Sequence, residues 1–176
     1  MFVLFLHNHH YNIFVYAFQK CCTSLLNLPF YYDEIPKNAN KRNAIRVLFN
    51  QIRGGRFTAI ISPLVAVELS KTAGIIKEKL LGLINDYKIE VLEPNENEVS
   101  LLVDEYMKEQ IVPEKYRDDA RHVAYATCLE VDVLVTYNLE HLANEWKMRQ
   151  FNGVNLKQGY NVLAIRTPEE VIFYGE

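Results

Sequence analysis

Two adjacent carboxylates and one amide stand where the chain could hold a metal ion. Asp118 and Asp119 open a segment rich in small residues, and Asn138 follows a short apolar run at 133–136. Carboxylate and amide oxygens are ligands that Mg²⁺ and Mn²⁺ prefer. Such an ion polarises a phosphoryl oxygen and lowers the pKa of bound water, so these residue types suit phosphodiester hydrolysis.

A further acid, Glu68, lies in a segment that we expect to be helical because Ser62 and Pro63 have the residue types of an N-cap and a first helical position. The sequence contains no glycine-rich phosphate loop, no paired C-x-x-C motif and no histidine–cysteine nucleophile pairing that would support another chemistry. Glu68 therefore joins the two aspartates and Asn138 as a candidate ligand.

Each of these residues also has a purely structural explanation. Asp118 or Asp119 can cap a helix and favour its dipole, Glu68 can be a solvated edge residue, and Asn138 is a common turn former. His122 is expected to lie on the exposed side of a helix. His141 and Asn144 are expected to close the turn after Asn138 rather than to meet a ligand.

The candidate residues need a sheet that brings them together. Apolar spacing predicts a helix over 41–53 that stops at Gly54-Gly55, and a capping pair, Asn95 with Glu98, opens another. The other expected helices cover 76–87, 118–129 and a short turn from Thr167-Pro168, and the expected strands are 57–61, 89–92, 131–136 and 162–165.

Strands that are continuously apolar and alternate with helices favour a mainly parallel sheet covered on both faces. Such sheets bind ligands at the carboxyl ends of their strands. Because Glu68, Asp119 and Asn138 each follow or flank a strand, we expect them to converge at that edge. Crowded carboxylates repel, so at least one of them should have a raised pKa.

Length and composition predict one domain covering residues 1–176, since 176 residues of which 49% are apolar can form a single full core. A net charge of −3 argues against a general nucleic-acid coat but allows a local basic strip, for which Lys41, Arg42 and Arg46 are candidates.

Three cysteines, at 21, 22 and 128, fit a reducing cytoplasm better than a disulfide framework. The apolar runs near the N-terminus are shorter than the ~20 residues of a membrane span, so no membrane association is expected. Residues 1–12 are expected to form a flexible or atypical extension, and the histidines at 7, 9 and 10 to be solvated.

The order of these elements resembles the PIN-domain family of small α/β, magnesium-dependent ribonucleases. The resemblance spans about residues 23–176. Residues 62–69 resemble the family's second acidic element, with Glu68 as the acid. Residues 117–124 resemble the third, in which Asp119 directly before Ala120 is the better match and Asp118 is an alternative or partner. Residues 134–144 resemble a subgroup in which Asn138 takes the fourth acidic position.

The resemblance implies a three-layer α/β/α fold and a Mg²⁺- or Mn²⁺-dependent ribonuclease. Glu68, Asp119, Asp118 and Asn138 would then form its metal and catalytic site. It also implies partners: an RNA substrate, an antitoxin protein if the chain is the toxin of a toxin–antitoxin pair, and a second copy of the chain in a homodimer.

The chain departs from the family at the first acid, where Cys22 stands in place of a carboxylate. A thiolate is a soft ligand and a poor match for Mg²⁺. Three interpretations remain open: the nuclease activity is lost or weakened, another acid such as Asp33 or Glu34 reaches the site, or the segment before about residue 23 is not the ancestral one. The alternative to an enzyme is a catalytically impaired PIN module that binds RNA or a protein partner.

Overall fold

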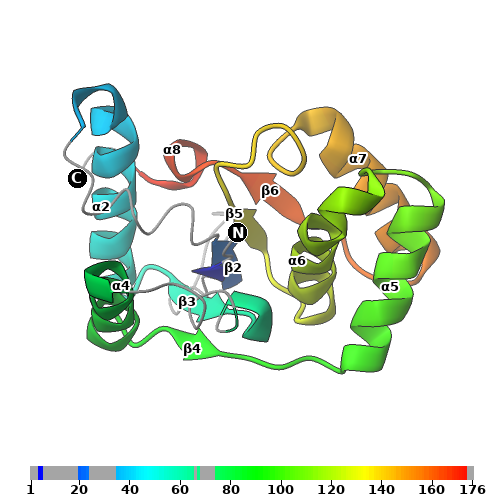
Figure 1. The fold of residues 1–176 in the computed structure, drawn as a ribbon, viewed down its shortest axis with the longest axis horizontal. Coiled ribbons are helices and arrows are strands. Elements are labelled where there is room, and N and C mark those ends of the chain that lie inside the picture. The colour runs from blue at the N-terminus through cyan, green and yellow to red at the C-terminus, as the bar shows by residue number, and fades with distance from the viewer. Residues whose placement is uncertain (1–3, 6–19, 24–34, 66, 68–73, 174–176) are drawn as a thin grey trace, which may run out of the picture.

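The computed structural model describes residues 4–5, 20–23, 35–65, 67 and 74–173 (Figure 1). Cys22 is described as backbone within a strand, without its side chain. Glu68, Asp33, Glu34 and the histidines at 7, 9 and 10 lie outside the described residues.

A parallel sheet forms the centre of the molecule. Strand β2 (Lys20–Thr23) pairs in parallel with β3 (Thr58–Ile61) on one side and with β5 (Val133–Val135) on the other. Beyond them, β4 (Glu90–Val91) pairs with β3 and β6 (Ala164–Arg166) pairs with β5, also in parallel. The order is therefore β4-β3-β2-β5-β6, and β1 (Leu4–Phe5) adds antiparallel pairings to β3 and β5. The predicted α/β class is confirmed.

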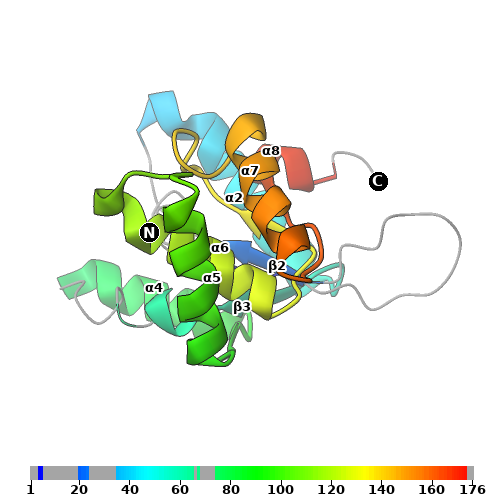
Figure 2. The ribbon, with the colours of Figure 1, turned by 90° about the vertical axis from the view of Figure 1, so that its right-hand side faces the viewer.

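Helices flank this sheet on both sides. Figure 1 shows α2 and α4 on one side and α5, α6 and α7 on the other, and in Figure 2 the second group faces the viewer. None of the helices in the described part of the chain is long and apolar enough to cross a membrane. The bounds are α2 Ala39–Arg53, α4 Gly74–Asp86, α5 Glu96–Lys108, α6 Arg117–Cys128, α7 Glu145–Lys157 and α8 Pro168–Val171, with 3₁₀ turns at Pro36–Asn38 and Glu114–Tyr116.

Local sequence signals account for several helix boundaries. Asn95 caps α5, since its side chain accepts a hydrogen bond from the backbone N–H of Asn97 at 3.0 Å. Thr167 and Glu170 form the capping box of α8. Ser62 differs from its expected role: its carbonyl accepts from the N–H of Val65 at 3.0 Å, but its buried hydroxyl has no hydrogen-bond partner among the described residues.

Helix α7 is not predicted by the apolar pattern. Trp146 and Leu156 are 67% and 60% exposed, and Asn152, Gly153 and Asn155 are poor helix formers. The signal that the pattern misses is local, because Asn144 accepts hydrogen bonds from the backbone N–H groups of Trp146 and Lys147 and so starts the helix. The last strand is also displaced, to 164–166 from the expected 162–165.

Helices α2, α4, α5, α6 and α7 all end in the same turn. The second residue past each helix cap donates its N–H to a carbonyl five residues earlier, as Ile111 does to Tyr106 at 3.2 Å. The residue before it has a positive φ, which glycine adopts without strain. The residues at this position are Gly55, Lys88, Gln110, Glu130 and Gly159, with φ of 74°, 50°, 53°, 50° and 85°.

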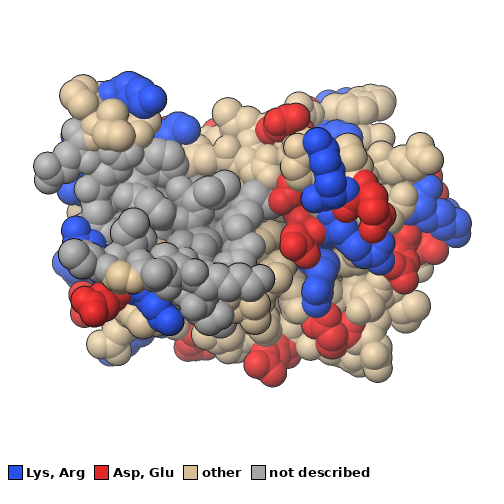
Figure 3. All heavy atoms as spheres, viewed as in Figure 1, with Lys and Arg blue, Asp and Glu red and all other residues tan. Residues whose placement is uncertain are grey.

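Ion pairs join the surfaces of α5 and α6. Arg121 pairs with Glu96 at 2.5 Å, and Arg117 pairs with Asp104. Figure 3 shows that cationic and anionic side chains alternate over these two helices. This face therefore carries no uniform positive field in its described part.

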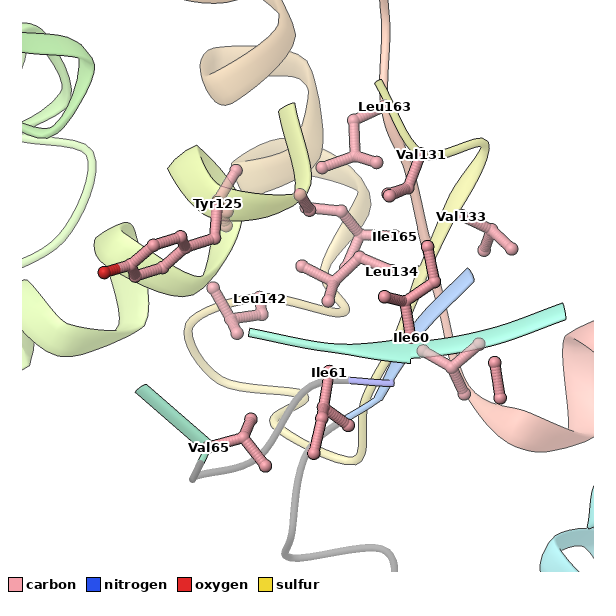
Figure 4. Close-up of a cluster of buried hydrophobic side chains, with 14 of the residues drawn as sticks. Ile60, Ile61, Val65, Tyr125, Val131, Val133, Leu134, Leu142, Leu163 and Ile165 are labelled. Carbon is pink, nitrogen blue, oxygen red and sulfur yellow. The ribbon is translucent and has the colours of Figure 1, made fainter. Parts of the chain in front are cut away.

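The core gathers side chains from three strands and the elements around them. Figure 4 shows Ile60 and Ile61 of β3, Leu134 of β5 and Ile165 of β6 in one apolar cluster with Leu142, all nearly inaccessible to solvent. Leu142 belongs to the loop after β5. Burying such a side chain contributes about 1.5–3 kcal/mol, so the loop that carries Asn138 is anchored in the core.

The helix ends generate a stability prediction. Gln110→Gly is expected to stabilise the protein by up to about 1 kcal/mol, because an L-residue at positive φ costs roughly 1–2 kcal/mol and glycine loses roughly 0.5–1 kcal/mol in entropy. The melting temperature should rise by about 2–4 °C per kcal/mol. Gly159→Ala is the opposite control and should lower it. A decrease for Gln110→Gly would mean that the Gln110 side chain itself stabilises the turn.

Candidate functional site

The first turn of α6 presents two carboxylates that differ in burial. Asp118 is exposed, whereas Asp119 retains 8% of its accessible surface. Neither residue is the N-cap, which is Tyr116, so the capping explanation for them is not supported. Both carboxylates still lie in the positive end of the helix dipole. Asp119 is buried together with Ala120, His122 and Val123, because α6 packs inside the fold.

The loop after β5 fixes Asn138 through its own hydrogen bonds. The backbone N–H of Asn138 donates to Oγ1 of the buried Thr136 at 3.1 Å. The Oδ1 of Asn138 accepts from the backbone N–H of His141 at 3.0 Å. Its carbonyl accepts from Leu142 at 3.0 Å and from Ala143 at 2.7 Å. The expected turn-forming role of Asn138 is therefore real, and it leaves the side-chain amino group directed elsewhere.

That amino group contacts the buried acid. The Nδ2 of Asn138 donates a hydrogen bond to Oδ2 of Asp119 at 2.9 Å. Two residues that are 19 positions apart in sequence thus meet at the carboxyl edge of the sheet. Because Oδ1 is bonded to the His141 N–H, the amide presents its donor to Asp119. Asn138 therefore orients the carboxylate through its Oδ2.

Burial raises the pKa of Asp119 above its usual value. Desolvation of the carboxylate is the main cause, and the hydrogen bond from Asn138 and the nearby His122 and His141 act in the opposite direction. The direction agrees with the expectation of a raised pKa, but the expected cause, crowding of carboxylates, is replaced by burial.

Two histidines lie closer to this acid than the sequence suggested. His122, expected on an exposed face, has no accessible surface, because α6 is buried on nearly all sides by the sheet and α5. His141 is 9% exposed, and its ring lies 3.8 Å from the ring of Tyr116. The run of alanines in α6 is the sequence signal for this all-round burial, since small residues allow close packing. Asn144 caps α7.

Tyr137 ties the same loop to the other side of the molecule. Its hydroxyl donates to Oε1 of Glu169 in α8 at 2.7 Å. The ammonium group of Lys41, from α2, lies 4.7 Å from the centre of its ring. Lys41 therefore lies beside the residue that precedes Asn138.

The remaining candidates are placed only in part. The backbone of Cys22 pairs with Ile60 and Leu134, one residue before the end of the central strand. Glu68 lies outside the described residues. Within the described segments, no three or more His, Cys, Asp or Glu side chains are grouped as a metal site.

The donor chemistry at this edge nonetheless fits a hard cation in part. Asp119 supplies a buried carboxylate that is held by Asn138, and Ser62, just past β3, supplies a buried hydroxyl without a hydrogen-bond partner among the described residues. Mg²⁺ in proteins is bound through one or two carboxylates and several waters, and Asp119 supplies one of these carboxylates. Comparisons with protein-family models, with curated proteins and with solved structures gave no match.

The buried acid generates a prediction about pH. Because the folded-state pKa of Asp119 is raised, the stability that this group contributes is fully present below about pH 4, where the carboxyl is protonated in the folded and unfolded states. That stability is lost as the pH rises through the folded-state pKa. Asp119→Asn keeps the neutral form at every pH and still accepts from Asn138. Its gain in unfolding free energy over wild type should therefore be absent near pH 4 and should grow toward pH 7, as measured by urea unfolding.

Asp118→Asn is the matched control, since it removes the same charge from the same helical turn at an exposed position. It should change stability by no more than about 0.5 kcal/mol. If Asp119→Asn is instead destabilising at pH 7, the ionised carboxylate has a stabilising structural role and the helix-dipole explanation gains.

Proposed function

We propose that this chain is a PIN-like, Mg²⁺- or Mn²⁺-dependent ribonuclease with Asp119 at the centre of its metal site. The observation that carries the proposal is the 2.9 Å contact between Asp119 and Asn138 at the carboxyl edge of the sheet. A buried, oriented carboxylate with a raised pKa is costly to a fold and typical of a functional site.

The strand order supports this assignment. From the central β2, the chain adds β3 and β4 on one side and β5 and β6 on the other. The order reverses between β2 and β5, and open α/β sheets bind ligands at such a switch point. Asn138 follows β5, directly beside it. With helices on both sides of the sheet, the arrangement is compatible with the three-layer α/β/α fold of the proposed family (Figure 1).

We assign the roles as follows. Asp119 and Glu68 would hold the ion, directly or through water, with Asp118 as a further carboxylate, and Asn138 keeps the Asp119 carboxylate oriented. A bound divalent cation would polarise a phosphoryl oxygen of the substrate and lower the pKa of a bound water. The chain needs to contribute little else beyond holding the phosphodiester in place.

Lys41 is our candidate for holding a phosphate group. It lies over Tyr137, next to Asn138, whereas the face formed by α5 and α6 mixes both charges. The RNA backbone would accordingly run along the α2 side of the site. An antitoxin protein and a second copy of the chain are further proposed partners, on the resemblance alone.

The alternative is a PIN module that binds RNA or a protein without cleaving. The feature that favours it is Cys22, because the chain has a thiol where the family has the carboxylate that a hard cation prefers.

Cleavage tests the proposal. Mn²⁺-dependent hydrolysis of a mixed single-stranded RNA should fall more than about 100-fold in Asp119→Asn and about 10–100-fold in Asn138→Ala, since removing a residue that orients a ligand typically costs that much. Cys22→Asp should increase the rate because the cation gains a charged oxygen. All variants are compared at one salt concentration, since RNA binding is salt-dependent.

The outcomes separate the interpretations. If wild type, Asp119→Asn and Cys22→Asp are all folded and inactive, the alternative is favoured, namely a PIN module that binds RNA or a protein without cleaving. If wild type is fully active and Cys22→Asp does not change the cleavage rate, another acid supplies the missing carboxylate, and Asp33 is the first candidate.

Metal binding can be measured without RNA. Millimolar Mn²⁺ should raise the melting temperature of wild type by mass action. When the ion is at 100 times its Kd, the free energy of unfolding increases by about 2.7 kcal/mol. The shift should disappear in Asp119→Asn and persist in Asp118→Asn at reduced size. Equal shifts in all three proteins would mean that the ion binds elsewhere.

A further inference from the structure

A hollow of about 360 Å³ lies at the amino edge of the sheet, opposite the Asp119–Asn138 pair. It is formed where α2 ends, β3 begins and α4 ends. The residues that line it are Ile52, Arg53, Gly55, Phe57, Thr58, Ala59, Asp86, Tyr87 and Lys88. Its volume falls within the roughly 300–1,000 Å³ range of small-molecule sites.

The floor of this hollow is apolar and rigid. Phe57 and Ala59 are each 3% exposed, and Tyr87 is 7% exposed. The Tyr87 ring packs edge-on against Phe49, with centroids 4.7 Å apart and an interplanar angle of 88°. These buried side chains close the base of the hollow with a rigid apolar wall.

The rim holds a guanidinium group in a fixed position. The Cζ of Arg53 lies 4.6 Å from the centre of the Tyr87 ring, and its Nη2 donates to the Tyr87 hydroxyl at 2.8 Å. Ring stacking and a hydrogen bond together restrict the side chain. A preorganised guanidinium binds an anion at a lower entropic cost than a mobile one, and its planar fork matches a carboxylate.

The charges around the opening favour an anion. Arg53 and Lys88 are cationic and Asp86 is anionic, which leaves one net positive charge over an apolar floor. A hollow on the other side of the sheet, beside α7, differs in this respect: it has a volume of about 290 Å³, and its Lys157 pairs with Glu109 at 3.4 Å, so that its opening is neutral.

We propose that the hollow beside Arg53 binds a small organic anion with a flat apolar body, such as an aromatic carboxylate. The apolar group enters the hollow above its closed base, and the carboxylate accepts hydrogen bonds from Arg53 with Lys88 nearby. This site is separate from the Asp119 edge and does not depend on any nuclease activity.

Three probes that share a phenyl group and differ in charge test the proposal. Phenylacetate is an anion, 2-phenylethanol is neutral and phenethylamine is a cation. In ¹H–¹⁵N NMR titrations of the full chain, phenylacetate should give saturable shifts at the amides of Thr58, Ala59 and Lys88. It should bind more tightly than the alcohol, and the amine should bind most weakly. Equal affinities, or no saturable shifts at these amides, would overturn the proposal.

Variants separate a specific site from general electrostatic attraction. Arg53→Met keeps an apolar stem and removes the guanidinium, and it should weaken phenylacetate binding about tenfold, the loss of one charge-assisted hydrogen bond. Lys88→Met is a second variant that leaves the Arg53–Tyr87 contact in place and should weaken binding less. Dispersed amide spectra verify folding in each case.

Arg56→Met is the matched control. Arg56 lies three residues from Arg53 and carries the same charge, but it lies over Phe173, with its Cζ 3.7 Å from the ring centre, and does not line the hollow. This substitution should change the affinity less than twofold. If it weakens phenylacetate binding as much as Arg53→Met does, the anion is attracted by net charge and the proposed site is wrong.

Discussion

The parallel pairing of β2 with both β3 and β5 is the constraint on which the rest of the structure depends. Parallel strands end at the same edge, so residues that follow β3 and β5 are brought to one place although the sequence separates them widely. Ser62 and Asn138 reach the carboxyl edge in this way, and α6 adds Asp119 there. The amino edge is left to the ends of α2 and α4, where the hollow beside Arg53 forms.

The Asp119–Asn138 contact combines a cost with a gain. Burying a carboxylate is unfavourable, and one hydrogen bond from a neutral amide offsets this only in part, which is why the pKa of Asp119 remains raised. The loop that presents Asn138 is itself held by Thr136, by the His141 N–H and by the buried Leu142. Rigid support of a buried carboxylate is the arrangement that a catalytic or metal-binding site requires, because its geometry must exist before the ligand arrives.

The sequence by itself determined the features that depend on near neighbours. The apolar spacing from Ile45 to Ile52 and the following Gly55 define α2, and the Asn95 and Thr167 caps start α5 and α8. Caps, turns and helical stripes involve residues within about five positions, so their signals can be read directly. The α/β class follows as well, since the apolar strands alternate with helices. The choice of Asp119 over Asp118 came from the resemblance to the PIN family and stays a prediction.

Tertiary structure decided what depends on distant partners. The burial of His122 follows from packing of α6 against the sheet and α5, which a one-helix pattern does not contain. The apolar pattern of helix α7 is too weak to predict the helix. Asn144 supplies a local start signal, but Met148 and Phe151 anchor the helix in the core. The orientation of Asn138 was decided by the His141 N–H, which accounts for its oxygen and turns its amino group toward Asp119. A residue type shows which atoms can bind, but only the fold decides which of them are already engaged, because each hydrogen bond needs a partner in space rather than in sequence.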